Sequence, residues 1–134
     1  MEIYQVNNEV MEVLYGMVKG LARQIKVYKG TMNEDANSIP TSYILLKSEI
    51  TDSASNYGDG QSVFRTADCD IVLVTKGTAT KTTDTHNVNK RRIRNHLLSQ
   101  GIEFIGNDLG YDTTLDSTQY TFSVGVKYGF KPQD

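Results

Sequence analysis

The first clear pattern of apolar and polar positions lies over residues 7–26. Asn7 or Asn8 is expected to cap its start by accepting a backbone N–H bond. Gly16 and Gly20 stand four residues apart on it, which favours a packing contact at that point. Apolar residues recur there every three or four positions, which predicts an amphipathic helix: Val10, Val13, Leu14, Met17, Val18, Leu21 and Ile25.

Two strands are predicted in the next part of the chain. A loop over 30–41 precedes a strand at 42–48, and a polar loop over 49–61 precedes a long strand from Ser62 to Lys76. Residues 71–74 are apolar on both faces, which indicates a central strand. The first half of the long strand is expected to be an exposed hairpin arm, with room for a β-bulge near Asp68–Asp70. One of its faces is formed by Val63, Ala67, Cys69, Ile71 and Leu73.

The second half of the chain predicts a helix between a polar loop and two strands. The run GTATKTTDTH at 77–86 has no large apolar side chain and is expected to be a mobile loop. A helix is expected over 88–99, capped by Asn87, ended by Gly101, and with Ile93, Leu97 and Leu98 facing inward.

Strands are expected at 102–106 and 119–128, separated by a turn-rich segment at 107–117. The last of these strands alternates most regularly, with Tyr120, Phe122, Val124, Val126 and Tyr128 on one face. Together the elements predict an α+β fold in a single domain, 1–134: a mixed, largely antiparallel sheet of four to five strands, two packed helices and long mobile loops.

Composition and charge exclude several classes of protein. The chain has 134 residues, of which 38% are apolar, and a net charge of −2. These values are ordinary for a globular domain and give no overall field that would attract DNA or an anionic membrane. A single cysteine, Cys69, indicates a reducing compartment. No apolar run is long enough to span a bilayer, and the N-terminus has no signal-peptide pattern.

The strongest local charge signal is the basic run Lys90-Arg91-Arg92-Ile93-Arg94. One interpretation is contact with nucleic-acid phosphates. A second, which we favour, is the solvated side of an amphipathic helix, because the rest of the chain is acidic and no set of aromatic residues flanks the run. A third is a salt-bridge surface between subunits, which would face acidic loops such as 108–116 of a neighbour.

No group of residues in the sequence predicts catalysis, a metal site or a cofactor. His86 and His96 stand ten residues apart and Cys69 stands alone, so metal-ligand spacing is lacking. Asp68 and Asp70 share one face of a strand, where a solvent-facing edge is the favoured explanation over paired carboxylates. The glycine motifs at 58–60 and 106–108 indicate turns.

Eight tyrosines and no tryptophan are present. Tyrosine combines apolar area with a polar tip, which makes it common at interfaces. Tyr57 and Tyr111 lie in predicted loops and are interface candidates, whereas Tyr43, Tyr120 and Tyr128 are expected in the core or on a sheet face.

The order of segments from Ile71 to Phe130 resembles that of one viral protein family. IVLVTKG is followed by a polar loop, the basic helix NKRRIRNHLLSQGIEF, the segment GNDLGYDTT and the strand QYTFSVGVKYGF. After a single amphipathic helix and a strand, this order resembles the tail terminator, or tail-to-head joining, proteins of siphophages, with a Bacillus siphophage type most similar. The resemblance covers about Ile3 to Phe130.

The resemblance implies a structural role without catalysis or cofactor. Such subunits are monomers when free and form a hexameric ring that caps the tail tube and docks the head connector, while DNA passes through the channel without specific binding. The implied location is the virion, after assembly in the host cytoplasm, with no membrane partner. Alternatives are a neck or head-completion protein and a small nucleic-acid-binding module that uses Lys90–Arg94. The interface candidates are Tyr57, Asp59, Lys81, Asp84, Lys90, Arg91, Arg92, Arg94, Asp108, Tyr111 and Asp112.

Overall fold

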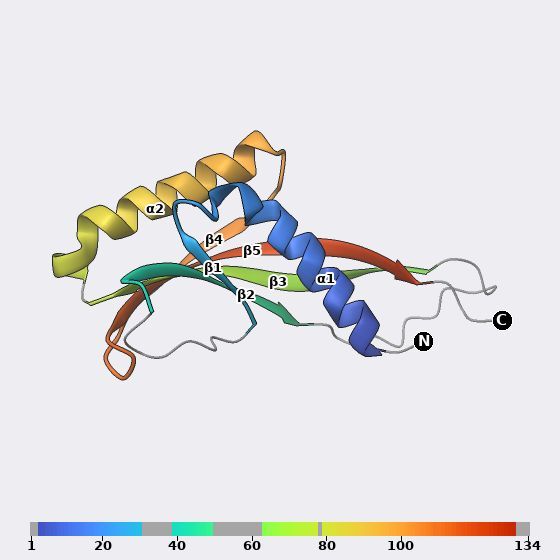
Figure 1. Cartoon of the computed structure of the whole chain (residues 1–134), viewed down its shortest axis with the longest axis horizontal. Coiled ribbons are helices and arrows are strands. Elements are labelled where there is room, and N and C mark those ends of the chain that lie inside the picture. Colours follow the sequence, from blue (N-terminus) through green and yellow to red (C-terminus); the bar gives the residue numbers. More distant parts are fainter. Residues whose placement is uncertain (1–2, 31–38, 50–62, 78, 131–134) are drawn as a thin grey trace.

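A computed structural model describes residues 3–30, 39–49, 63–77 and 79–130, with side chains over 10–30, 39–48, 67–77 and 84–126. The described strands form one sheet in the order β1-β2-β3-β5-β4, in which β1 and β2 are parallel and all other neighbours antiparallel. The predicted α+β class is therefore confirmed. The elements are α1 (Ile3–Val18), the 3-10 helix η1 (Lys19–Leu21), β1 (Lys26–Lys29), β2 (Ser42–Glu49), β3 (Val63–Lys76), α2 (Ala79–Ser99), β4 (Ile105–Asp112) and β5 (Ser117–Phe130) (Figure 1).

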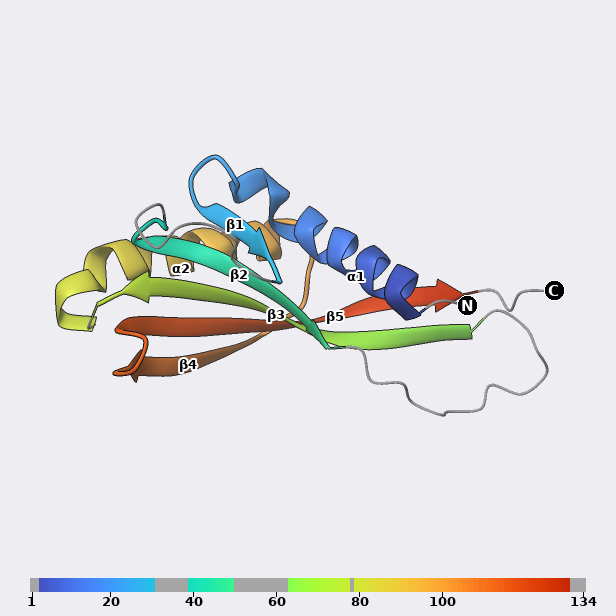
Figure 2. The ribbon, with the colours of Figure 1, turned by 60° about the horizontal axis from the view of Figure 1, so that its bottom comes forward.

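Both helices lie on the same face of the sheet, and the main core fills the space between them and the strands (Figures 1 and 2). The alternation predicted for the two long strands is confirmed for most of the described side chains, because Ala67, Cys69, Ile71 and Leu73 of β3 and Phe122, Val124 and Val126 of β5 are buried on this face. Tyr120 is partly buried, and the side chains of Val63 and Tyr128 lie outside the described residues. The helices contribute Val10, Leu14, Val18, Leu21, Ile93 and Leu97, and the strands Ile44, Leu46, Ala67, Cys69, Ile71, Leu73, Phe122, Val124 and Val126.

The opposite face of the sheet also buries apolar side chains near its centre. Val72 and Val74 on β3 are 4% and 7% exposed, as expected for a central strand. Beside them, the rings of Tyr28 and Tyr43 meet edge to face at 5.4 Å between centroids. We call this side of the sheet, away from the helices, the open face.

The two longest strands extend beyond the rest of the sheet as a two-stranded arm (Figure 2). β2 ends at the pair Glu49–Asp68, whereas β3 and β5 stay paired as far as Val63–Phe130. An arm is thus formed with β5, but the expectation that it is exposed is wrong where its side chains are described, because Ala67 and Val126 are each 1% exposed and belong to the core. The register is continuous through Asp68–Asp70, so the bulge considered there is wrong; a register shift occurs instead in β4, between Asp108 and Gly110.

The N-terminal helix begins and ends earlier than its apolar pattern indicated. α1 starts at Ile3, so Asn7 and Asn8 lie inside the helix and the predicted cap is wrong. Of the predicted stripe, Val13 is 45% exposed, because the sheet covers a narrower face than the pattern indicated. Gly20 does mark a contact: a Cβ there would meet the His96 imidazole at 2.8 Å, so the glycine lets α2 approach.

The second helix is longer than predicted. α2 begins at Ala79, so the mobile loop over 77–86 and the cap at Asn87 are both wrong. The end of the helix is as expected: Gly101 adopts a φ of +71°, and the Ile102 amide donates back to the Leu97 carbonyl at 3.0 Å. Ile93 and Leu97 are fully buried, but Leu98 is 56% exposed, contrary to the predicted inner face.

The turn-rich segment predicted at 107–117 is mostly a strand. Residues 105–112 form β4 along β5, and only 113–116 make the turn that joins them. The motif at 106–108 is therefore strand and not a turn. Glycine, asparagine and aspartate disfavour strands in general, but pairing with the exposed edge of β5 overrides that preference here.

Candidate functional site

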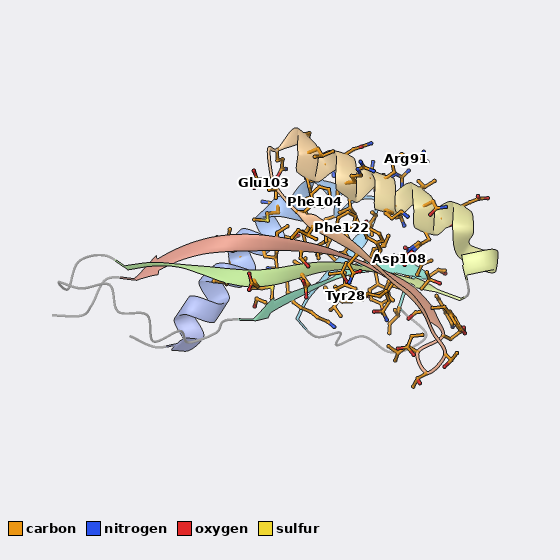
Figure 3. All side chains as sticks on the ribbon, turned by 180° about the vertical axis from the view of Figure 1, so that it is seen from behind. Tyr28, Arg91, Glu103, Phe104, Asp108 and Phe122 are labelled. Carbon is orange, nitrogen blue, oxygen red and sulfur yellow. The ribbon has the colours of Figure 1, made fainter. Side chains whose placement is uncertain are left out.

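The basic run lies on α2, above β5. Lys90, Arg91 and Arg94 line a hollow of about 380 Å³ whose other side is formed by Tyr120 and Phe122 of β5. The Lys90 ammonium nitrogen lies 5.0 Å from the centre of the Tyr120 ring, which is a cation–π distance. Tyr120 thus supplies the aromatic neighbour that the sequence pattern did not reveal. Figure 3 shows Arg91 on α2, with Phe122 lying toward the sheet.

The remaining charged candidates on α2 do not join this hollow. Arg92 points elsewhere and donates from Nη1 to the Asn89 side-chain oxygen at 3.4 Å. Asp84 is exposed near the start of the helix. Tyr57, Asp59 and the side chain of Lys81 lie outside the described residues.

The edge strand β4 is the most exposed element of the described sheet. Every residue in it is exposed except Gly110, which is intermediate. Among the described residues, four of the seven exposed large apolar side chains lie on β4 or the following turn. They are Ile105 at 74%, Leu109 at 52%, Tyr111 at 39% and Leu115 at 64%. A sheet edge with such side chains is typical of a surface that another chain completes.

The acidic candidates on β4 also shape its backbone. Asp108 accepts a bond from the Gly110 amide at 2.9 Å across the bulge. Asp112 accepts one from the Thr114 amide at 2.9 Å, and the Tyr111 hydroxyl donates to Asp116 at 2.6 Å. Asp108 and Asp112 therefore stay exposed at fixed positions along the edge.

A buried polar network connects α2 to the sheet. The fully buried Thr75 hydroxyl lies 2.8 Å from His86 Nδ1 and 3.0 Å from the Ser42 hydroxyl, and Asn89 donates to Ser42 at 2.9 Å. This network was not predicted from the sequence. The signal available was a histidine and an asparagine at helical spacing ahead of the buried Ile93.

The surroundings of His86 favour the neutral form of its imidazole. Burial lowers the pKa of His86, the nearby Lys90 charge lowers it further, and Asp108 partly offsets both effects. His86 is 6% exposed and Thr75 is not exposed at all. The imidazole–hydroxyl pair is thus closed off from substrates, and its role is to anchor the helix.

Cys69 is a buried thiol between two aspartates of β3. The thiol is 1% exposed, and burial, with Asp70 and Asp68 adding to it, raises its pKa to about 11. Asp70 accepts a bond from the Ser123 hydroxyl at 2.9 Å, which is a structural contact. The described residues contain no group of three or more side chains placed to hold a metal ion.

A second hollow, of about 420 Å³, lies on the open face. Tyr43, Leu45, Val72 and Val74 give it an apolar floor, and lysines stand at its sides.

Within the described part of the chain, neither helix has the length and apolar character needed to cross a membrane.

Comparisons with known proteins add no family assignment. No protein-family model matches this chain, and no curated protein is significantly similar to it in sequence. Function therefore has to be argued from the pattern of the chain and from the surface formed by α2 and β4.

Proposed function

We propose that this chain is a structural subunit of a siphophage virion, which caps the tail tube at its final length and docks the DNA-filled head. The observation that carries the proposal is the β4 edge, whose exposed apolar and acidic side chains are typical of a strand completed by a neighbouring subunit. The resemblance in element order to tail terminator proteins supplies the identity of the assembly.

The proposed partners are other copies of the chain in a hexameric ring, the tail tube protein and the head connector. The subunit is proposed to be a monomer before assembly in the host cytoplasm and to reside at the tail end of the virion. Of the polar loop predicted over 49–61, Glu49 is the last residue of β2, and residues 50–61 lie outside the described residues.

Deletion in the phage that encodes the chain tests the proposed role. Without the protein, electron microscopy should show filled heads separate from tails, and tails of abnormal length. Supplying the chain in trans should restore joined particles, and a labelled copy should be found at one end of the tail. Normal, joined particles in the deletion strain would rule the proposal out.

A neck or head-completion protein is the closest alternative within the same class. Such a protein binds the connector before any tail is present. The two roles can be told apart by mixing the chain separately with purified connectors and with purified tail tubes. A tail terminator should bind the tube. Binding to the connector alone would favour the neck protein.

The hollow beneath α2 supports a second candidate function, binding of nucleic acid. Lys90, Arg91 and Arg94 surround Tyr120 there, which combines phosphate-binding cations with an aromatic ring. Affinity for duplex DNA should then fall steeply with salt and should weaken in Arg91→Ala/Arg94→Ala, but not in the exposed control Arg23→Ala. Negligible binding at physiological salt would exclude this function.

A further inference from the structure

We infer that copies of this chain join edge to edge, with β4 of one copy pairing with β1 of the next in antiparallel order. The inference rests on the proposed ring and adds to it the strands, the register and the charges of the contact. β1 and β4 are the outer strands of the described sheet and lie at its opposite sides (Figure 2). A contact between two different edges is heterologous, and such contacts build rings when the rotation closes.

The charges of the two edges are complementary. β4 exposes Asp108 and Asp112, whereas the four residues of β1 include the exposed Lys26 and Lys29. Pairing β4 with β4 would bring carboxylates together, and pairing β1 with β1 would do the same with lysines. Like charges directly opposite each other destabilise a strand pair, so the charges favour β4 against β1.

The direction of pairing follows from the order of strands in the sheet. β1 is parallel to β2, and each of the next three pairs, β2–β3, β3–β5 and β5–β4, is antiparallel. β4 therefore runs opposite to β1 within one copy. A neighbour that keeps its helices on the same side and continues the sheet presents β1 antiparallel to β4.

The faces on which the acidic side chains of β4 lie are set by its register with β5. Asp108 pairs with Tyr120, whose side chain packs on the helix side of the sheet. Asp112 pairs with Ser117, which lines the hollow of the open face. The bulge at Leu109 is the reason why two residues four apart lie on opposite faces.

The lysines of β1 divide between the same two faces. Lys29 lies on the helix side, where its ammonium is 3.0 Å from Glu12 and 4.3 Å from the centre of the Tyr15 ring. Lys26, three residues earlier on the strand, lies on the open face near the Tyr28 ring. Each lysine thus lies on the face that also carries one aspartate of β4.

One register brings both charge pairs together. With Lys26 opposite Asp112, Val27 falls opposite Tyr111 and Tyr28 opposite Gly110, which has no side chain to obstruct it. Lys29 then falls at the bulge, opposite Asp108, because the extra residue Leu109 is taken up there. A contact of only four residues on β1 is small, which agrees with subunits that stay separate until a tube end gathers them.

The helix layer of the neighbouring copy would cover the basic face of α2. Glu12 on α1 is tied to Lys29, so it accompanies β1 to the contact. There it would approach Arg91, which stands on α2 on the same side of the sheet as Asp108 (Figure 3), and Arg94, which lines the same hollow as Arg91. The basic run and the acidic edge are then parts of one interface.

Charge exchange between two variants of the full chain tests the pairing. Asp108→Lys/Asp112→Lys and Lys26→Glu/Lys29→Glu should each lower assembly on purified tail tubes, measured by co-sedimentation, by at least tenfold. An equal mixture should recover assembly, because each altered edge then meets an opposite charge. The exposed pair Asp68→Lys/Lys76→Glu, on the inner strand β3 and away from both edges, is the control and should assemble normally. Variants that both give wild-type circular dichroism but do not recover when mixed would overturn the inference.

Disulfide cross-linking tests the register. Val27→Cys/Tyr111→Cys in one chain should give a ladder of linked copies on oxidation, whereas Val27→Cys/Asn107→Cys should give at least tenfold less. Equal yields would overturn the register. The inference and the tail function can fail separately: a ring at the tail end that is insensitive to the charge changes refutes edge pairing alone. Conversely, the charge variants could recover assembly when mixed, while the deletion strain still joins heads to tails normally. That combination refutes the tail function alone.

Discussion

Thr75→Val should destabilise the fold by removing the central hydroxyl of the buried network. Valine keeps the shape of the side chain but leaves His86 Nδ1 and the Ser42 hydroxyl without their shared partner. Each lost hydrogen bond costs about 1 kcal/mol, and a buried polar atom left unpaired adds to that cost, so the total should be about 3 kcal/mol. For a chain of this length, such a loss lowers the melting temperature by about 10 °C.

Urea unfolding followed by circular dichroism measures this cost directly. Thr121→Val is the matched control, since Thr121 is also a buried threonine, 7% exposed, on the neighbouring strand β5. No side-chain hydrogen bond involves it in the described residues, so valine should be tolerated there. If the two variants unfold at the same urea concentration, the network does not stabilise α2 as we argue.

Other predictions follow from single sites. The pKa of His86 is lower in the fold than its unfolded value of about 6.5, so the unfolded state binds more protons below that pH. The stability of the fold, measured by thermal melts, should therefore decrease from pH 7 to pH 5. The decrease should be smaller in His86→Asn. Gly106→Ala should destabilise, because a Cβ would overlap the Tyr120 hydroxyl, whereas Gly16→Ala, with nothing within 4 Å, should stabilise α1 by about 1 kcal/mol in urea unfolding. Cys69, with its pKa raised to about 11, should react with a thiol reagent only in denaturant; labelling of the native chain would contradict its burial.

The sequence was most informative where side chains alternate between core and solvent. The centre of β3, over 71–74, was predicted because both of its faces are apolar. The inward residues of β5 from Phe122 to Val126 were predicted because burial on one face imposes a period of two. The inward residues Ile93 and Leu97 were identified for the same reason, with a period near 3.6. These positions record the packing itself.

The elements that were missed are the ones whose structure depends on a partner elsewhere in the fold. The start of α2 is rich in threonine, a poor helix former, and His86 anchors it through Thr75, which lies on another element. β1 has four residues, too few to show a period, and forms along β2. β4 buries almost no side chain, so nothing in its own sequence distinguishes it from a turn.

The candidate surface was predicted in part. The basic run and the acidic segment were both identified, and a contact between them across subunits was one of three interpretations. The positions of these two segments in the fold were not predicted. Only the strand order reveals that Asp108 belongs to an edge beneath α2, and only the fold brings Tyr120 to Lys90.

The exposure of β4 also bears on how this protein changes over generations. A strand held mainly by backbone pairing tolerates amino-acid substitution at most of its positions, while the core formed by β3, β5 and the two helices stays intact. Apart from the glycines Gly106 and Gly110, substitutions there carry little folding penalty, unlike those at Leu14 or Phe122. The chain can therefore adjust its outer contacts to altered neighbours without first acquiring compensating changes in its interior.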